Sequence, residues 1–597
     1  MDNNSNTQQR LDGVRNAMAK LKLDALIIPH DDENLGEYTP LHCERLAWVT
    51  GFTGSAGAAI IMPERATLFV DGRYTIQARE QSPEPLFEHE DLVETPYAKW
   101  LTSQLKPGAR VGFDPKLHNF SWYKKTKTLL EQYSMTLVPL ENNLIDPLWS
   151  DRPAPSTAPA RELPLTITGV SSQQKRDNIA KSLTEQQLDA ALITQSESIN
   201  WLLNIRGRDI ECLPVVMGFA IVYQDSRCEF YTDPAKFSDP LQQHMGVGVT
   251  IHPQAEFSGA LKQLGQQKAR VQVDPDTANA WCQLLLESSG ASLNPQADPC
   301  MQPKAAKNTA EVDGMKRAHL RDAAAVCRFL SWLDKLVEQG GDADEASLAA
   351  KIDGYRKELA EYVEPSFSTI SALGPNAAMC HYNFRNGTPR KLECDGLYLV
   401  DSGGQYLDGT TDITRTVKVG QVSREMCRLF TLVLKGNIAL DSARFPVGTS
   451  GIQLDVLARS ALWQQGYNYA HGTGHGVGHF LNVHEGPQRI SPKGSDTPLQ
   501  PGMVVSNEPG YYREGGFGIR SENLLVVQSC DQPSELPMLC FEKLTYVPFD
   551  LRLIERSLLT EQEIDWINSY HAEVYRKISP ALAGDDLLWL EQATRAL

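Results

Sequence analysis

The segment from His471 to Pro487, with the sequence HGTGHGVGHFLNVHEGP, holds four of the chain's 13 histidines. Glycine occupies every second position from 472 to 478, and because glycine is a poor helix former this spacing disfavours a helix. The HExxH pattern of helical zinc proteases is absent, and neither GxGxxG nor GxxxxGK is present as a phosphate loop. Glycines of this kind let a backbone and a ligand approach closely. The segment therefore favours a ligand site over a set of structural core histidines.

Four carboxylates lie at the ends of predicted strands in the same region. Asp401 follows the apolar run LYLV, and Asp412 lies beyond the turn-rich SGGQYLDG, so a hairpin would bring the two together. Glu508 precedes a proline and is held extended, and Glu522 alternates with Arg520 on a strand that otherwise reads as buried. An aspartate at a strand end is most often a turn former, and the Arg520–Glu522 pair could be an internal salt bridge. The alternative is a metal site, since burying an unpaired carboxylate is very costly.

One histidine and four carboxylates form a hard, oxygen-rich set of donors. Such donors suit manganese, iron, cobalt or magnesium better than a thiolate-type zinc site. Four carboxylates would overcharge a single ion, whereas two divalent ions that share bridging carboxylates balance the charge. Two metals can lower the pKa of a bridging water and polarise a carbonyl, so the set predicts metal-dependent hydrolysis.

The elements that must position these residues read as an α+β region from about residue 305. A long helix is predicted from Thr309 to Gly340, with Thr309 as its N-cap and Glu311 in its first turn. The later segments GLYLVDSGG, TTDITRTVKVG, GMVVSNEPGYY and FGIRSENLLVV alternate as strands do. Most of the unusual polar residues therefore fall at strand ends.

Two earlier stretches resemble each other, and each reads as an α/β unit. A helix-like run precedes LKLDALIIP in the first and EQQLDAALIT in the second; ERLAWVTGF and ESINWLLNI follow. The copies lie about 165 residues apart, which favours internal duplication over two unrelated domains. Because the proline-rich stretches 151–164 and 288–304 read as boundaries, we expect domains at 1–150, 165–300 and 305–597. The last would end in an extension from about residue 540.

Composition narrows the classes of function. At 597 residues the chain is too long for one core, and its net charge of −17 argues against a nucleic-acid partner. The 11 cysteines include no CxxC pair and predict free thiols in a reducing compartment. The polar start does not read as a signal peptide, and no apolar run reaches the length of a membrane span. We expect a cytoplasmic protein with no membrane partner.

The candidate ligands, in this order and local context, resemble the five ligands of the pita-bread metallopeptidases. HGTGHGVGHFLNVHEGP, NEPGYY and FGIRSEN are similar to the three-domain aminopeptidase P (Xaa-Pro aminopeptidase) family, and GFTGSAG, DGRY, LWSDRP and EKLTYVPFD extend the likeness over nearly the whole chain. The resemblance implies two creatinase-like α/β domains followed by a pita-bread α+β catalytic domain. It also implies peptide substrates with proline at the second position, two manganese ions per chain and a homodimer.

The resemblance further implies a role for each metal ligand. Asp401 would bind one metal, and Asp412 and Glu522 would bridge both. His475 and Glu508 would complete the two shells. Glu508 would also take the proton from the bridging water as a general base.

Other residues would act around this set. Arg520 would pair with ligand carboxylates. Three histidines would orient the scissile carbonyl, bind the proline side and stabilise the oxyanion without binding metal: His381, His471 and His484. Asn507 stands where many relatives carry Asp, and His479 falls at a variable place, where we expect an ordinary loop histidine.

Two alternatives stay open at this stage. A prolidase uses the same ligands on dipeptides but usually lacks the middle domain, so two N-terminal units favour longer peptides. A non-catalytic pita-bread binding module is the alternative from another class. Because such a module has no reason to keep all five ligand positions, their presence favours an enzyme.

Overall fold

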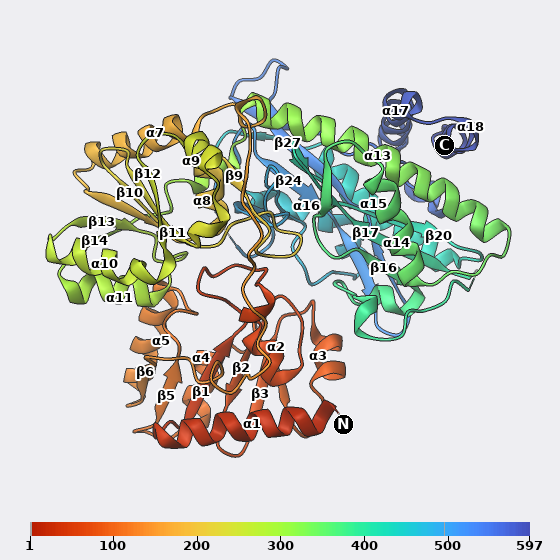
Figure 1. The fold of residues 1–597 in the computed structure, drawn as a ribbon. Helices are drawn as coiled ribbons and strands as arrows, with labels where there is room; N and C mark the ends of the chain where they lie inside the picture. The colour runs from red at the N-terminus through yellow and green to blue at the C-terminus, as the bar shows by residue number, and fades with distance from the viewer. Residues whose placement is uncertain (1–2, 394, 495) are drawn as a thin grey trace. The chain divides into compact units, whose positions relative to one another are not determined.

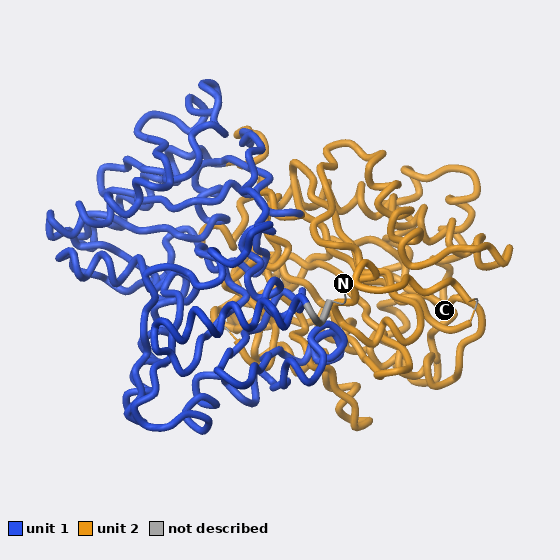
Figure 2. The backbone as a smooth tube through the Cα atoms, turned by 60° about the horizontal axis from the view of Figure 1, so that its bottom comes forward, with its two compact units in different colours: residues 1–163, 170–211, 215–301 blue, residues 164–169, 212–214, 302–597 orange. Residues whose placement is uncertain are grey.

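A computed structural model describes residues 3–393, 395–494 and 496–597 (Figure 1). The chain folds as two compact units, which are coloured separately in Figure 2. Unit 1 comprises residues 1–163, 170–211 and 215–301, and unit 2 comprises residues 164–169, 212–214 and 302–597. None of the described helices combines the length and the apolar character that a membrane span requires.

Unit 1 contains two six-stranded sheets of the same design. Their strand orders are β4-β3-β2-β1-β5-β6 and β12-β11-β10-β8-β13-β14. In each sheet the strand after the first helix, β1 or β8, pairs antiparallel on one side and parallel on the other. The helices that precede these strands are α1 (Asn3–Lys20) and α7 (Ser172–Glu185). This shared order and direction is what internal duplication predicts.

The strands of these sheets are short. Those of the first sheet are β1 (Ala25–Pro29), β2 (Ala58–Ile61), β3 (Ala66–Val70), β4 (Glu88–Asp91), β5 (Arg110–Phe113) and β6 (Thr136–Pro139). Those of the second are β8 (Ala190–Ile193), β10 (Phe219–Tyr223), β11 (Cys228–Thr232), β12 (Val249–Pro253), β13 (Arg270–Val273) and β14 (Ser292–Pro295). Both β1 and β8 are buried along their whole length, which is why LDALIIP and LDAALI read as apolar runs.

Alternate residues of β1 enter two different cores. Leu26 and Ile28 pack in the core that also contains residues of α1. Ala25 and Ile27 pack on the opposite face, with residues of α4 (Tyr97–Gln104) and α5 (Phe120–Gln132). Helices therefore cover both faces of the sheet, as expected for an α/β layer.

The longest described helix of unit 2 is α13 (Thr309–Glu338), whose N-cap is Asn308 and not Thr309 as predicted. The Asn308 side chain accepts hydrogen bonds from the backbone N–H groups of Ala310 at 3.0 Å and Glu311 at 3.2 Å. Glu311 accepts in return from the Asn308 N–H at 3.0 Å. Asn308 has an extended backbone, so the first helical residue is Thr309 and the capping box starts one residue earlier.

The described strands of unit 2 form two three-stranded sheets, one two-stranded sheet and one six-stranded sheet. Their orders are β15-β18-β19, β16-β17-β20, β25-β26 and β21-β28-β27-β24-β22-β23. The bounds are β15 (Tyr362–Pro365), β16 (Ile370–Leu373), β17 (Leu397–Ser402), β18 (Gly404–Tyr406), β19 (Gly409–Thr410), β20 (Ile413–Lys418), β21 (Arg444–Pro446), β22 (Gly474–Gly476), β23 (Glu485–Ile490), β24 (Val504–Asn507), β25 (Gly510–Arg513), β26 (Phe517–Arg520), β27 (Asn523–Ser529) and β28 (Met538–Lys543).

Helices α14 (Glu345–Lys357), α15 (Arg424–Asp441), α16 (Gly451–Trp463), α17 (Glu561–Ile578) and α18 (Gly584–Ala593) complete unit 2 (Figure 1). Buried side chains from α13, α15, β17, β20 and α17 share one large apolar core. The C-terminal helices α17 and α18 are therefore part of the packing of this unit.

The segment FGIRSENLLVV, predicted as one strand, is broken between Arg520 and Asn523. β26 ends at Arg520 and pairs with β25, whereas β27 starts at Asn523 and pairs with β24. Between them, the Ser521 N–H donates to the Pro509 carbonyl and the Glu522 N–H to that of Thr414, each at 3.2 Å. The prediction was wrong because the chain changes strand partner here, which places Glu522 between two strands.

Candidate active site

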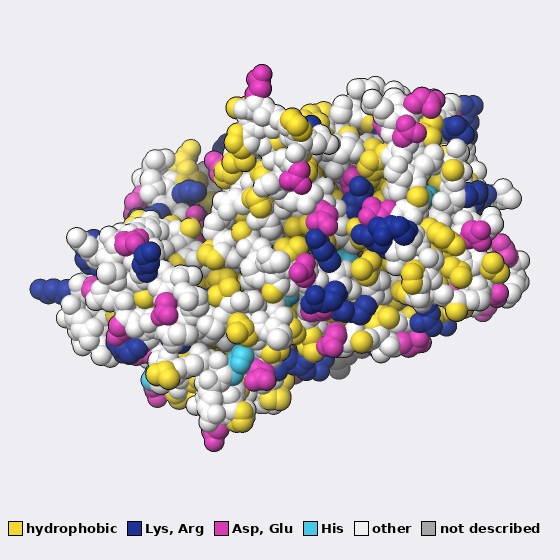
Figure 3. Space-filling model, turned by 90° about the horizontal axis from the view of Figure 1, so that it is seen from above, with side chains coloured by type: hydrophobic (Ala, Val, Ile, Leu, Met, Phe, Trp, Pro, Cys, Tyr) yellow, Lys and Arg dark blue, Asp and Glu magenta, His cyan; other side chains and the backbone are white. Residues whose placement is uncertain are grey.

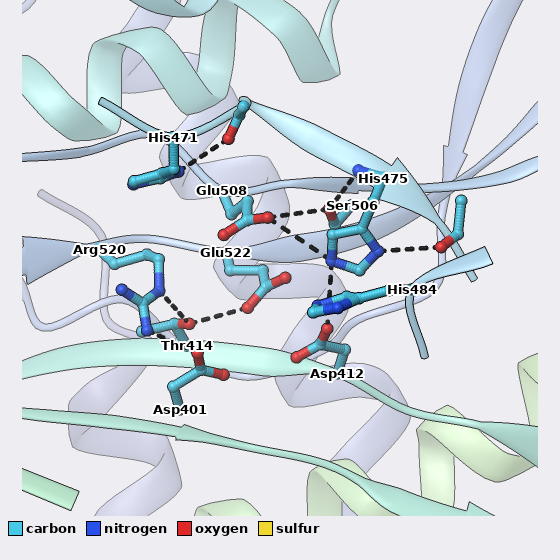
Figure 4. Close-up of polar contacts among 12 residues, drawn as sticks. Asp401, Asp412, Thr414, His471, His475, His484, Ser506, Glu508, Arg520 and Glu522 are labelled. Atoms are coloured by element: carbon cyan, nitrogen blue, oxygen red, sulfur yellow. Dashed lines mark hydrogen bonds and ion pairs between the residues drawn. The ribbon is translucent and has the colours of Figure 1, made fainter. Parts of the chain in front are cut away.

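Strand ends of unit 2 bring the five predicted ligands together (Figure 4). Asp401 lies in β17, opposite Thr414 of β20, and Asp412 directly precedes β20. The short strands β18 and β19 form the hairpin predicted between these two aspartates. The other three come from a second set of elements: His475 in β22, Glu508 after β24, and Glu522 between β26 and β27.

His475 lies between two of the carboxylates. Its Nε2 is 3.6 Å from Asp412 Oδ2 and 3.5 Å from Glu508 Oε1. Asp412, His475 and Glu522 each offer one donor atom, and these atoms lie within 4.8 Å of one another. His475 Nδ1 is 2.9 Å from the Gly476 carbonyl, which can only accept a hydrogen bond. In the neutral ring Nδ1 therefore carries the proton, and the lone pair of Nε2 faces the carboxylates, as a metal ligand requires.

The carboxylates repel one another in a buried place. Burial, together with the charges of Glu522, Asp401 and Glu508, raises the pKa of Asp412 well above its usual range. Burial and the Asp401 charge raise the pKa of Glu522 to about 8. The pKa of Glu508 is also well above its usual range, owing to burial and then to Glu522.

Asp401 adds a further sign that this pocket suits cations. Its Oδ1 atom is buried and has no hydrogen-bond partner among the described residues. A buried carboxylate oxygen without a partner, inside a group of mutually repelling acids, is stabilised when positive charge is added. The donor set of four carboxylates and one imidazole therefore fits divalent cations.

Arg520 supplies the positive charge that the chain itself contributes. Its Nη2 lies 2.6 Å from Asp401 Oδ2, and its Nε donates to Thr414 Oγ1 at 3.0 Å. The Thr414 hydroxyl donates in turn to Glu522 Oε2 at 2.8 Å. One arginine and one threonine thereby fix two of the acids, and Figure 4 shows this chain of contacts. The sequence predicted Arg520 beside the ligands but not Thr414.

Tyr512 joins Arg520 to the predicted substrate histidine His471. Arg520 Nη1 donates to the Tyr512 hydroxyl at 2.7 Å, and that hydroxyl lies 2.9 Å from His471 Nε2. His471 Nδ1 is 2.8 Å from the Gly472 carbonyl, so Nε2 accepts from Tyr512 in the neutral ring. Sequence reasoning missed Tyr512, although its place in NEPGYY was a signal that could have found it.

His484 lies beside His475, and His381 lies beside His484. The His484 ring meets the His475 ring edge-on, with centroids 4.4 Å apart, and the His381 ring is 6.5 Å from that of His484. The structure therefore brings His484 next to the predicted ligand His475 and next to His381, and it links the third predicted substrate histidine, His471, to Arg520 through Tyr512.

The two departures from the family pattern, Asn507 and His479, are both buried. Asn507 and Asn437 exchange hydrogen bonds: each side-chain amide donates to the backbone carbonyl of the other residue, at 2.8 and 2.9 Å. These bonds tie β24 to α15. His479 is buried, and a Cβ built on Gly314 of α13 would lie 3.0 Å from its Nε2. His479 lies in the loop between β22 and β23, as expected, and its buried ring packs against α13.

The glycines around His475 serve strand packing. A Cβ on Gly474 would overlap the Ser506 carbonyl, and one on Gly476 would overlap the Glu485 carbonyl. The sequence interpretation, that they open the backbone to a ligand, overlooked this packing between strands. Their absence of side chains lets β22 fit between β23 and β24, which places His475 beside Glu508.

Four family models match the chain. Metallopeptidase family M24 matches residues 313–529, and the C-terminal region of peptidase M24 matches residues 537–597. Two models, both described as a creatinase/prolidase N-terminal domain, match residues 10–148 and 151–311. The two N-terminal matches agree with the repeated sheet design of unit 1.

Relatives extend over the full length of the chain. A probable Xaa-Pro aminopeptidase P of Botryotinia fuckeliana is 38% identical, over 99% of this chain and 93% of the relative. Aminopeptidase P2 of Arabidopsis thaliana is also 38% identical, over 99% and 88%. The crystal structure of X-prolyl aminopeptidase from Caenorhabditis elegans, described as a cytosolic enzyme with a di-nuclear active site, is 34% identical and superimposes with a TM-score of 0.95, covering 99% of this chain and 100% of that one. The chain therefore belongs to the Xaa-Pro aminopeptidase P family of M24 metallopeptidases.

Proposed function

We propose that this protein is a metal-dependent aminopeptidase that hydrolyses the N-terminal Xaa–Pro bond of peptides. The observation that carries the proposal is the buried group of one imidazole and four carboxylates in a chain of this family. The prolidase alternative has less support, since the full-length relatives are named for aminopeptidase P.

Two divalent ions would be held by Asp401, Asp412, His475, Glu508 and Glu522. When bound, they supply Lewis acidity, which acidifies water and polarises the scissile carbonyl. The donor chemistry and the di-nuclear site of the C. elegans relative support two ions, and oxygen-rich donors support manganese as their identity. Elemental analysis after gentle purification tests this: manganese approaching two per chain is expected, and a metal-free preparation that cleaves peptides would refute it.

The side chains have separate tasks in the proposed reaction. Glu508 accepts the proton of the attacking water and passes it to the proline nitrogen of the leaving peptide. Arg520 and Thr414 hold the neighbouring acids in place. His484 and His381 donate hydrogen bonds to the carbonyl oxygen as its charge develops, and His471 binds the proline side.

The proposed setting is a cytoplasmic homodimer. The cytosolic C. elegans relative and the predominance of buried, free cysteines among those described support the compartment. Ile452, Val456 and Trp463 are exposed along α16, which supports association, since exposed apolar patches mark interaction sites. Sedimentation should give twice the chain mass of 66.3 kDa, and a monomer at micromolar concentration would refute the dimer.

The activity is tested with three peptides: Arg-Pro-Pro, Arg-Ala-Pro and Arg-Pro. Release of arginine from Arg-Pro-Pro with little release from Arg-Ala-Pro is expected. Equal cleavage of the alanine peptide would refute the proline requirement. Exclusive cleavage of the dipeptide Arg-Pro would favour a prolidase.

A further inference from the structure

A buried cluster of two lysines and one glutamate lies beside the candidate active site. Lys304 Nζ is 2.8 Å from Glu485 Oε2, and Lys307 Nζ contacts Glu485 Oε1. The side chains of Lys304, Lys307 and Glu485 are 6%, 0% and 1% exposed, respectively. None of these three residues has a part in the mechanism above.

The cluster ties a segment outside the catalytic sheet to two strands that adjoin site residues, because His484 directly precedes β23 and Glu508 directly follows β24. Glu485 is the first residue of β23, follows His484 directly, and lies opposite Gly476, the neighbour of His475. The Lys307 N–H donates to the Gly502 carbonyl at 3.1 Å, and Ala306 bridges to Met503, which directly precedes β24. The segment from Lys304 to Lys307 is thereby fixed to both sides of the strand that bears His475.

Burying three charged side chains is a costly way to support a strand, because each must leave water. Two ammonium groups share one carboxylate, and the charge of Glu311 also acts on Lys307. Burial lowers the pKa of Lys307, whereas the pKa of Glu485, which burial alone would raise, is held low by the two lysines. Buried ion pairs are often no more stabilising than apolar packing of the same volume, although removing one partner is strongly destabilising. A cluster of this kind fixes geometry more than it adds stability.

We propose that Lys304 and Lys307 are positioning residues for the peptidase reaction, acting through Glu485 to hold His484 against the substrate carbonyl. This rests on the proposed function. The lysines fall inside the stretch that matches a creatinase/prolidase N-terminal domain, residues 151–311, yet they pack within unit 2. The M24 match, which starts at residue 313, does not include these two lysines.

A double-mutant cycle in the full-length, manganese-loaded enzyme tests the link to His484. Lys304→Met and Lys307→Met are each expected to lower kcat/KM for Arg-Pro-Pro by roughly ten- to a hundredfold, mainly in kcat, because small displacements of a positioned group are costly. In a His484→Ala background the same substitutions should cause no further loss, since their effect passes through that ring. Metal content should stay at the wild-type value.

Lys316→Met is the matched control. Lys316 also pairs with a glutamate at 2.8 Å in unit 2, but its side chain is 36% exposed, so kcat/KM should change less than about twofold. Glu485→Gln keeps the shape of the acid and is the further variant where a lysine variant does not fold. Equal losses with and without His484, a loss of metal in parallel with activity, or no difference from Lys316→Met would overturn the proposal.

Hydrogen exchange separates this inference from the proposed function. Failure of the wild-type enzyme to cleave Arg-Pro-Pro would refute the function itself. The structural part of the inference, that the lysines hold the segment after His484, is tested independently by the amide protection of residues 484–490. Lys304→Met should lower this protection while Lys316→Met leaves it unchanged, and equal protection in both variants would overturn the inference.

Discussion

At the scale of single residues, His475 and His484 have rings only 4.4 Å apart but different tasks. His475 points Nε2 at Asp412 and Glu508, whereas His484 packs edge-on against it. We therefore expect His475→Ala to reduce metal content from about two ions toward one per chain and to lower kcat/KM more than about a hundredfold. His484→Ala should lower the rate and keep the metal. Elemental analysis with kinetics decides, and loss of metal in His484→Ala would make that histidine a ligand.

Arg520 is expected to control metal affinity without touching a metal. Arg520→Met removes the positive charge that pairs with Asp401 and the N–H group that donates to Thr414. The acids are then less well fixed. We expect the apparent dissociation constant for manganese to rise roughly ten- to a hundredfold, as for other groups that orient ligands. Isothermal titration of the metal-free protein measures it. Arg513→Met is the control, because Arg513 pairs with Glu425 at the exposed surface, and an equal effect there would contradict this role.

At the scale of elements, the N-cap of α13 is Asn308, whereas the sequence suggested Thr309. Asn308 caps the helix and also donates to the Thr168 carbonyl at 2.9 Å, so Asn308→Ala should cost about 1–2 kcal/mol of stability. Thr309 is the first helical residue, and Thr309→Ala should change stability by less than about 0.5 kcal/mol. Denaturant midpoints of the two variants give the comparison. A larger loss for Thr309→Ala would restore Thr309 as the cap.

Helix α17 introduces an acid-sensitive contact into the core of unit 2. The Nε2 of His571 accepts a hydrogen bond from the Phe549 N–H at 3.1 Å, and burial, then the Arg415 charge, lowers its pKa to about 3. The ring is neutral when folded but titrates near its ordinary pKa of 6.5 when unfolded. Its contribution to the stability of the fold is therefore complete above about pH 6.5 and is lost as the pH falls from 6.5 toward 3. The loss reaches about 2 kcal/mol at pH 5.

The variant His571→Gln should abolish this pH dependence. Its melting temperature at pH 6.5 should lie below that of the wild type, because the native contact is disturbed. On acidification to pH 5, however, the wild type should lose more of its melting temperature than the variant. Parallel losses would show that His571 is not the group that titrates.

Elements and their order were more predictable than the contacts between them. The repeated LDAL segments foretold two sheets of one design, because apolar runs and turns are local signals. The break between β26 and β27 was not foreseeable from alternation, since a change of strand partner depends on residues far away in the chain, here Pro509 and Thr414. Lys304 and Lys307 were overlooked for the same reason. Lys304 is the last residue of a stretch that reads as a linker, Lys307 follows that stretch, and only the fold pairs them with Glu485.

At the scale of the whole molecule, side chains of both charges reach the surface (Figure 3). Acidic and basic side chains are interspersed over the face shown in Figure 3, and the net charge is −17. A negative field of this kind favours the approach of peptides with a charged N-terminal amine. Because surface charges are screened by salt, we attribute substrate selection to the site and not to this field.

The two units should respond differently to metal removal. Each has its own apolar cores, and all five predicted ligands lie in unit 2. Metal bound only by the folded state stabilises it by about 2.7 kcal/mol per site at a hundredfold excess over the dissociation constant. Removal also restores the repulsion among Asp412, Glu508 and Glu522. Scanning calorimetry should show separate transitions, of which EDTA lowers one by roughly 5–10 °C and leaves the other unchanged. Manganese should reverse the shift, and His475→Ala should show a smaller one. A shift of both transitions by the same amount, or of neither, would place the metal elsewhere than in unit 2.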